Sequence, residues 1–162
     1  MKKFSLYSPQ QQSSTLQHLI QKYESPQMEK GYDYYFIKEG DHLLVYTEKL
    51  HVYPSTSKRF GETELIASQF EMPFSGIRWF INAIEHKFFK SPEDGGLPAN
   101  KISYEEIVDG EDLHIIRSVT AGCSHPGYVV TNGSRNSHIS SISLQTLALS
   151  DPWLFKRGLM DF

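Results

Sequence analysis

Residues 70–89 read FEMPFSGIRWFINAIEHKFF and carry the clearest local signal in the chain. Apolar side chains recur there at three- and four-residue steps, at positions 77, 80, 81, 84 and 88. This spacing predicts an amphipathic helix over 75–90, with Ser75 as its N-cap. The preceding residues, 64–72, read as a strand that runs directly into this helix.

Further strands are expected upstream of this junction. Residues 32–39 and 42–53 are rich in aromatic and β-branched side chains, and Gly40-Asp41 separates them. Two such runs joined by a short glycine-containing turn favour a β-hairpin. Residues 55–61 (STSKRFG) then form a polar, basic loop.

The N-terminal segment, residues 1–31, is expected to contain a short helix. Leu16, Leu19, Ile20 and Tyr23 follow one another at three- and four-residue steps, after two serines that can serve as an N-cap. Pro26 would end this helix, because proline cannot continue one.

The second half of the chain repeats the order of strands followed by a helix. Residues 102–108 and 113–119 flank Asp109-Gly110, a strong hairpin signal. Residues 128–131 and 138–144 flank a turn at Asn132-Gly133 that is extended by residues 134–137, which predicts a hairpin with a longer connection. A final helix is expected after Ser150-Asp151-Pro152, and it carries Trp153.

These patterns predict an α+β fold built from antiparallel strands. Two units of strands followed by a helix, 32–90 and 101–162, would form a pseudo-repeat packed as one domain, with the Pro- and Gly-rich segment 91–100 between them. The helices around Trp79 and Trp153 would then occupy related positions on related sheets.

Composition limits the classes of function. The chain has 162 residues, and 16 Lys and Arg against 19 Asp and Glu give a net charge of −3, which argues against strong, sequence-blind binding of nucleic acid. The single cysteine, Cys123, fits a reducing compartment. No apolar run is long enough to span a membrane, so we expect a cytoplasmic protein.

The strand-to-helix junction resembles one in a group of known families. Phe70-Glu71-Met72-Pro73 running into 76–89 is similar to the junction in PUR-alpha, and residues 142–144 followed by 151–160 are a fainter match. The order of elements resembles the fold shared by the PUR-alpha, Whirly and PC4 coactivator families. This resemblance implies binding of single-stranded DNA or RNA on the sheet face and hairpin loops.

Single-strand binding requires cations for phosphates and exposed aromatic rings for bases. The candidate residues of that composition are Lys58, Arg59, Phe60, Tyr35, Arg117, Tyr128 and Arg135. The alternative interpretation is that the strand aromatics belong to the core and that the loop cations only solubilise the surface.

Catalytic and metal-binding signatures are missing from the sequence. The seven histidines show no HExxH or i, i+4 pair, so neither a metal nor another cofactor is expected. Cys123-Ser124-His125 places a thiol beside a base, but such neighbours on a loop rarely have catalytic geometry. We therefore expect a non-enzymatic protein, and an enzyme of unrecognised type stays open as a third alternative.

Two functions follow from these observations. The first is a nucleic-acid-binding protein with a preference for single strands. The alternative is a protein-interaction module, such as an adaptor or inhibitory partner, that uses a sheet edge or an apolar patch. A homodimer is compatible with both, because open sheets expose edges that need covering.

Overall fold

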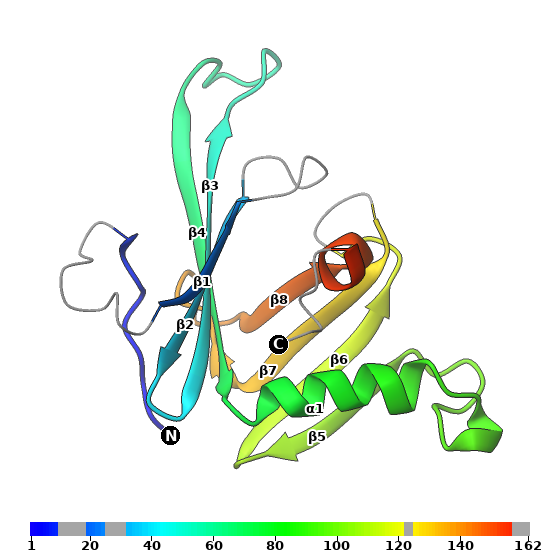
Figure 1. The fold of residues 1–162 in the computed structure, drawn as a ribbon. Helices are drawn as coiled ribbons and strands as arrows, with labels where there is room; N and C mark the ends of the chain where they lie inside the picture. The colour runs from blue at the N-terminus through cyan, green and yellow to red at the C-terminus, as the bar shows by residue number, and fades with distance from the viewer. Residues whose placement is uncertain (10–18, 25–31, 122–124, 157–162) are drawn as a thin grey trace.

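The computed structural model describes residues 1–9, 19–24, 32–121 and 125–156 (Figure 1). These residues form two antiparallel sheets of four strands each, and both sheets follow the order of the strands along the chain. The first sheet contains β1 (Leu19–Glu24), β2 (Tyr32–Glu39), β3 (His42–Val52) and β4 (Thr63–Pro73). The second contains β5 (Ser103–Val108), β6 (Glu111–Ser118), β7 (Gly127–Asn136) and β8 (Leu144–Ser150).

A helical segment follows each sheet. After β4 comes α1 (Gly76–Ala83), which continues as the π-helical turn η4 (Ile84–Phe88). The short 3-10 helix η5 (Pro92–Asp94) lies in the connection to β5, and the π-helical segment η6 (Pro152–Lys156) follows β8. The expected α+β class is confirmed in this general form, as mostly antiparallel strands with few helices.

The strand-to-helix junction has the predicted elements, a strand that leads directly into a helix. The predicted helix over 75–90 corresponds to α1 and η4. Ser75 occupies the N-cap position, but its hydroxyl hydrogen-bonds to Asp109 Oδ2 at 2.5 Å instead of capping the helix. Asp109 and Gly110 both have positive φ angles, 46° and 83°, as a tight hairpin turn requires.

The predicted N-terminal helix is wrong for residues 19–24, which form β1. This strand pairs antiparallel with β2, from Leu19 opposite Ile37 to Glu24 opposite Asp33. The physical reason is that β2 offers a free edge whose N–H and C=O groups need partners, a requirement that helical spacing in a short segment does not reveal. The first part of the predicted helix, residues 16–18, lies outside the described residues.

The predicted turn at Asn132-Gly133 is also wrong, because β7 continues through both residues to Asn136. The side-chain amide of Asn132 is fully buried, and Gly133 lies so close to β6 that a Cβ would be 2.9 Å from Asp112 Oδ2. This glycine therefore leaves room for the Asp112 side chain and forms no turn.

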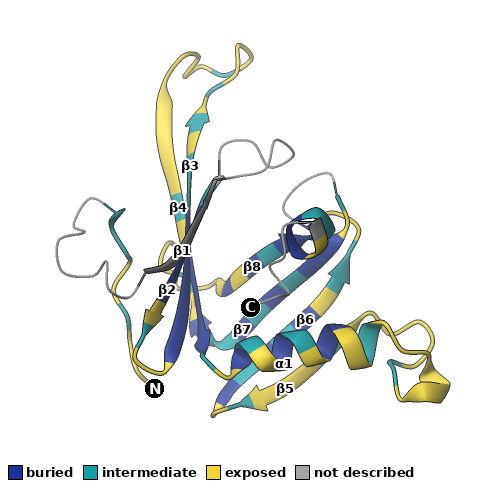
Figure 2. Ribbon diagram, in the orientation of Figure 1, coloured by how far each residue is buried: buried dark blue, intermediate teal, exposed yellow. Residues whose placement is uncertain are grey.

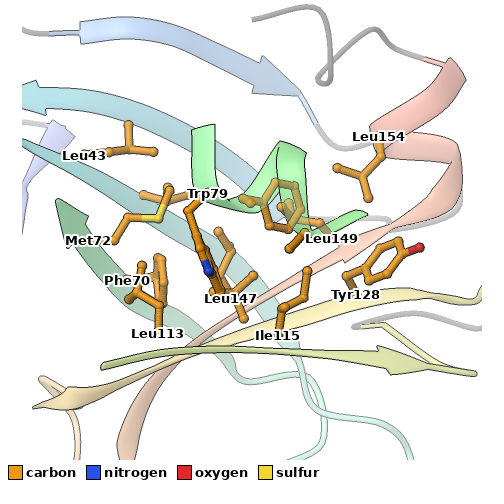
Figure 3. Close-up of a cluster of buried hydrophobic side chains, with 14 of the residues drawn as sticks. Leu43, Phe70, Met72, Trp79, Leu113, Ile115, Tyr128, Leu147, Leu149 and Leu154 are labelled. Atoms are coloured by element: carbon orange, nitrogen blue, oxygen red, sulfur yellow. The ribbon is translucent and has the colours of Figure 1, made fainter. Parts of the chain in front are cut away.

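The helices pack across the two sheets, and this arrangement builds the main core (Figure 3). The ring of Trp79 in α1 stacks on Tyr104 of the second sheet, with centroids 6.4 Å apart. The ring of Trp153 in η6 lies 4.7 Å from that of Tyr34 in the first sheet. Each helical segment therefore contacts the sheet of the other half of the chain.

Among the described residues, no helix has the length and apolar character needed to cross a membrane.

Candidate functional site

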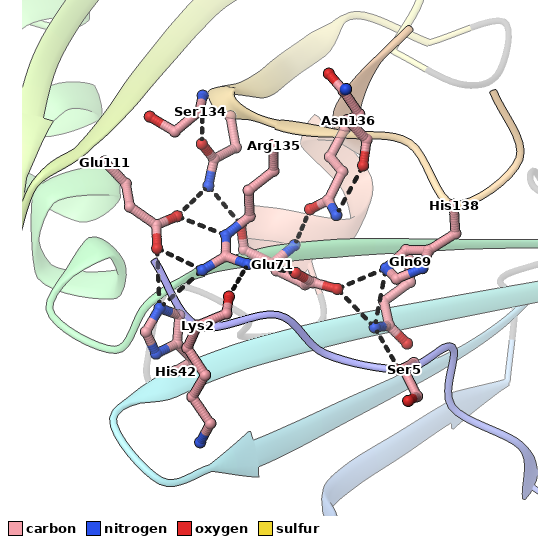
Figure 4. Close-up of polar contacts among 12 residues, drawn as sticks. Lys2, Ser5, His42, Gln69, Glu71, Glu111, Ser134, Arg135, Asn136 and His138 are labelled. Atoms are coloured by element: carbon pink, nitrogen blue, oxygen red, sulfur yellow. Dashed lines mark hydrogen bonds and ion pairs between the residues drawn. The ribbon is translucent and has the colours of Figure 1, made fainter. Parts of the chain in front are cut away.

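The most polar part of the interior is a buried ion cluster centred on Arg135 (Figure 4). Arg135 donates Nε to Glu111 Oε2 at 2.7 Å and Nη2 to Glu111 Oε1 at 2.5 Å. Its Nη1 donates to Glu71 Oε2 at 2.8 Å. Glu71 belongs to the first sheet, whereas Glu111 and Arg135 belong to the second, so these contacts join the two sheets.

An irregularity in β7 directs Arg135 inward. Tyr128, Val130 and Asn132 follow one another at two-residue steps and are buried, but the next buried residue is Arg135, three positions on. The pairing of β7 with β8 shifts register between Asn132 and Asn136. Between the pairs that these two residues make, β7 advances four residues and β8 only one, so β7 bulges, and the Arg135 side chain points toward the interior.

Neighbouring polar side chains pair with the remaining groups of the ion cluster. Asn132 Nδ2 donates to Glu111 Oε2 at 2.6 Å, and His42 Nε2 lies 2.9 Å from Glu111 Oε1. His138 Nε2 lies 2.6 Å from Glu71 Oε1. Each ionised group therefore has several partners, as burial of charge requires.

The ion cluster also holds the N-terminal segment in place. Arg135 Nη1 donates to the carbonyl oxygen of Lys2 at 2.8 Å, and its guanidinium lies 5.3 Å from the ring centroid of Phe4. Gln69 donates to the carbonyl of Ser5 at 3.1 Å and accepts from the N–H of Tyr7 at 2.8 Å. The first residues of the chain are thus anchored to both sheets.

Arg135 is therefore fully engaged inside the protein. Its side chain is 4% exposed and its donors face carboxylates and a carbonyl, so it does not offer a guanidinium to a phosphate in this structure. Among the described residues, no group of three His, Cys, Asp or Glu side chains is placed to hold a metal ion. Cys123 lies outside the described residues.

Arg117 and Tyr128 form a second pair of predicted site residues. Arg117 donates both Nη atoms to Asp151, at 2.5 and 2.6 Å, and its guanidinium lies 4.7 Å from the ring centroid of Tyr128. Tyr128 is 2% exposed and contacts Phe88. The cation is thus neutralised, and the aromatic ring belongs to the core.

Tyr35 is buried as well, on the opposite face of the first sheet. It packs beside Tyr46 and Tyr7 at centroid distances of 5.8 and 5.9 Å. Its hydroxyl donates to Glu48 at 3.2 Å. Tyr35 and Tyr128 are therefore buried core residues, as the alternative interpretation of the strand aromatics expects.

The remaining candidates, Lys58, Arg59 and Phe60, lie together in the loop between β3 and β4. Arg59 folds over the ring of Tyr53 at 4.1 Å and pairs with Glu62 at 2.6 Å and Glu64 at 3.1 Å. A hydrogen bond from Tyr53, followed by one from Arg59, holds the pKa of the Glu64 carboxyl below its usual range.

The other two residues of this loop are accessible. Phe60 is 68% exposed. Lys58 is exposed and has no ion-pair or hydrogen-bond partner among the described residues. Of the seven predicted residues, the structure thus brings three together at the loop and leaves two of those, Lys58 and Phe60, free to contact a ligand.

The outer ends of β3 and β4, with the loop that joins them, extend past the other strands of both sheets (Figure 1). Much of this outer part of the hairpin is exposed (Figure 2). Leu50 and Leu65 are cross-strand partners with 58% and 57% of their surface exposed. Val52, 59% exposed, and the partly buried Ala67 lie on the same face. These four residues are called the hairpin stripe.

A groove lies between α1 and β5. Its volume is about 550 Å³, and both apolar and charged side chains line it. Trp79 and Ala83 line it from the helix, and Tyr104 and Val108 from the strand. Because β5 is an edge strand of the second sheet among the described residues, the groove runs along a sheet edge.

Comparison of the chain with protein-family models, curated proteins and solved structures gives no match. The interpretation of these surfaces therefore rests on their own chemistry.

We expect Glu111 to make stability depend on acid pH. Burial alone would raise the pKa of its carboxyl, but hydrogen bonds from Arg135, His42 and Asn132 outweigh this effect and lower the pKa from 4.5 to about 2. A lowered pKa stabilises the folded state above pH 4.5, and this contribution, about 3 kcal/mol, is lost as the pH falls through 2.

Urea unfolding of the wild type and Glu111→Gln across this pH range tests the expectation. The difference between their free energies of unfolding should shrink by about 3 kcal/mol from neutral to strongly acid pH. Replacing the exposed Glu93 with Gln serves as the control and should leave the pH dependence unchanged. A difference between wild type and Glu111→Gln that is constant with pH would show that Glu111 does not titrate in this way.

Proposed function

We propose that this chain is a non-enzymatic protein-interaction module that forms a homodimer through the hairpin stripe. The observation that carries the proposal is the projecting β3–β4 hairpin, which exposes more than half of Leu50, Val52 and Leu65 on one face. Apolar side chains gathered on a projecting element are typical of an interaction site. Fully burying such a side chain contributes roughly 1.5–3 kcal/mol, and covering the exposed half of each of these contributes about half as much.

A second copy of the chain suits the hairpin stripe chemically. Leu50 and Leu65 face each other at its centre, so a twofold axis there would place like apolar residues against each other. Two acidic residues lie on this face beside the hairpin stripe, Glu48 and its cross-strand partner Asp33. Glu48 accepts hydrogen bonds from the hydroxyls of Tyr35 and Tyr46 at 3.2 and 3.0 Å. At the centre of the hairpin stripe the contact is between apolar side chains, Leu50 and Leu65.

Replacing Leu65 with Glu should convert the dimer into a monomer, because two buried carboxylates would then lie in the interface. Sedimentation velocity should give twice the chain mass of 18.6 kDa for the wild type and a single chain mass for Leu65→Glu. Ile66→Glu is the matched control, since Ile66 is 42% exposed on the opposite face of the same strand. A wild-type monomer, or a Leu65→Glu dimer, would contradict the proposal.

We also propose that the two halves are an internal repeat. Both have four strands in sequential order followed by a helical segment, and each helical segment places a tryptophan on a tyrosine of the other sheet. The cytoplasm remains the proposed compartment, because a single cysteine suits a reducing environment.

Single-strand nucleic-acid binding is the second candidate function. It is favoured by Lys58 and Phe60, an accessible cation and an accessible aromatic ring two residues apart at the end of the hairpin. It ranks second because Tyr35, Tyr128 and Arg135 are buried, and because Arg59 and Arg117 are paired with carboxylates.

Fluorescence anisotropy with a labelled single-stranded oligonucleotide in a salt series tests this candidate. If Lys58 contacts a phosphate, Lys58→Glu should weaken binding and reduce the slope of log K against log salt by about 0.7. Lys101→Glu, an exposed cation near β5, is the control and should leave the slope unchanged. No binding by the wild type at low salt would exclude this candidate.

A further inference from the structure

The groove between α1 and β5 has a polar wall whose groups lack partners. Arg78, Asn82 and His86 lie one helical turn apart along α1 and η4, and all three are exposed and line the groove. None of their side chains has an ion-pair or hydrogen-bond partner among the residues that the structure describes. These groups are available to a ligand.

The carboxylates on the strand side of the groove are already engaged. Glu106 accepts a hydrogen bond from the Tyr104 hydroxyl at 2.8 Å, and Asp109 is bonded to Ser75. The Lys87 amino group lies 5.5 Å from the Tyr104 ring centroid. The free charge at the start of the groove is therefore the guanidinium of Arg78.

The other wall offers a row of backbone groups. The N–H of Arg117 donates to the carbonyl of Ile102, the residue just before β5. This bond identifies Ile102 and Arg117 as a hydrogen-bonded pair and so determines which of the following pairs of β5 and β6 are bonded. Since bonded pairs alternate along an antiparallel ladder, Tyr104, Glu106 and Val108 bond to β6. The N–H and C=O groups of Ser103, Glu105 and Ile107 therefore point away from the sheet.

The spacings of the two walls match an extended chain. One helical turn of four residues advances about 6 Å. Two residues of a strand advance roughly 6.8 Å, and alternate side chains face the same side. A strand laid along β5 would therefore direct every second side chain toward Arg78, Asn82 and His86 in turn.

We propose that this groove binds an extended segment of a partner protein, which adds to β5 as a fifth strand and places an acidic side chain against Arg78. Main-chain hydrogen bonds to Ser103, Glu105 and Ile107 supply the affinity, and the helix wall supplies the specificity. The inference rests on the proposed protein-interaction function and adds the class of partner. It concerns a surface separate from the hairpin stripe.

The test is selection of a displayed library of random dodecapeptides on the full chain, followed by affinity measurements with the enriched peptides. Enriched peptides should be free of proline at their centre and carry Asp or Glu at a fixed position. Arg78→Glu should weaken their binding about tenfold, and replacing the acidic residue of the peptide with Lys should restore it. This exchange of charges identifies the contact with Arg78.

The backbone contact is tested separately. Ile107→Pro removes an outward N–H without breaking a bond to β6 and should abolish peptide binding, whereas Ile107→Thr keeps the N–H and should bind as the wild type does. In hydrogen exchange, peptide should slow the amides of Ser103, Glu105 and Ile107 and leave that of Glu106 unchanged.

Failure of the library to yield peptides, or peptides whose binding ignores both Arg78→Glu and Ile107→Pro, would overturn the inference. Because Leu65→Glu leaves the groove intact, peptide binding by that variant distinguishes failure of this inference from failure of the proposed dimer. Enriched peptides that protect the hairpin amides in place of those of β5 would likewise contradict it.

Discussion

The structure depends on one buried interaction, the guanidinium of Arg135 shared between Glu71 of the first sheet and Glu111 of the second. Removing three ionised groups from water is costly, and only close hydrogen bonds on every side offset that cost. The ion cluster provides them through Asn132, His42 and the carbonyl of Lys2. Because apolar packing alone tolerates sliding, these directional contacts fix how the two sheets meet.

Fixing the two sheets in this way determines which surfaces remain outside. Residues near the β2–β3 turn, such as His42 and Leu43, are buried beside the ion cluster and the core, whereas the other end of the β3–β4 hairpin extends past the second sheet. At the far side, α1 crosses onto the second sheet and lies along β5. The hairpin stripe and the edge of β5 are thus consequences of the same packing, and both offer groups that a protein partner can satisfy.

The sequence predicted elements whose signals are local and missed contacts made across the fold. The 75–90 helix and the Asp109-Gly110 turn have spacing and backbone chemistry that need no tertiary context. The sequence pattern places Arg135 in a loop that follows Asn132-Gly133, whereas in the structure β7 continues through a bulge and the side chain points inward. Glu71 carried a weak signal, a carboxylate within the apolar stretch 70–74, but nothing local identifies Glu111 as its counterpart. The hairpin stripe required the strand register, which sequence spacing leaves open.

The most direct test of this account is the free energy of unfolding of Arg135→Met, measured by urea titration at neutral pH. The variant leaves two carboxylates buried without their cation, so the account predicts a loss of about 3–5 kcal/mol. Arg78→Met, which removes an exposed arginine, should change stability by less than about 0.5 kcal/mol. An Arg135→Met protein as stable as this control would contradict the central role of the ion cluster.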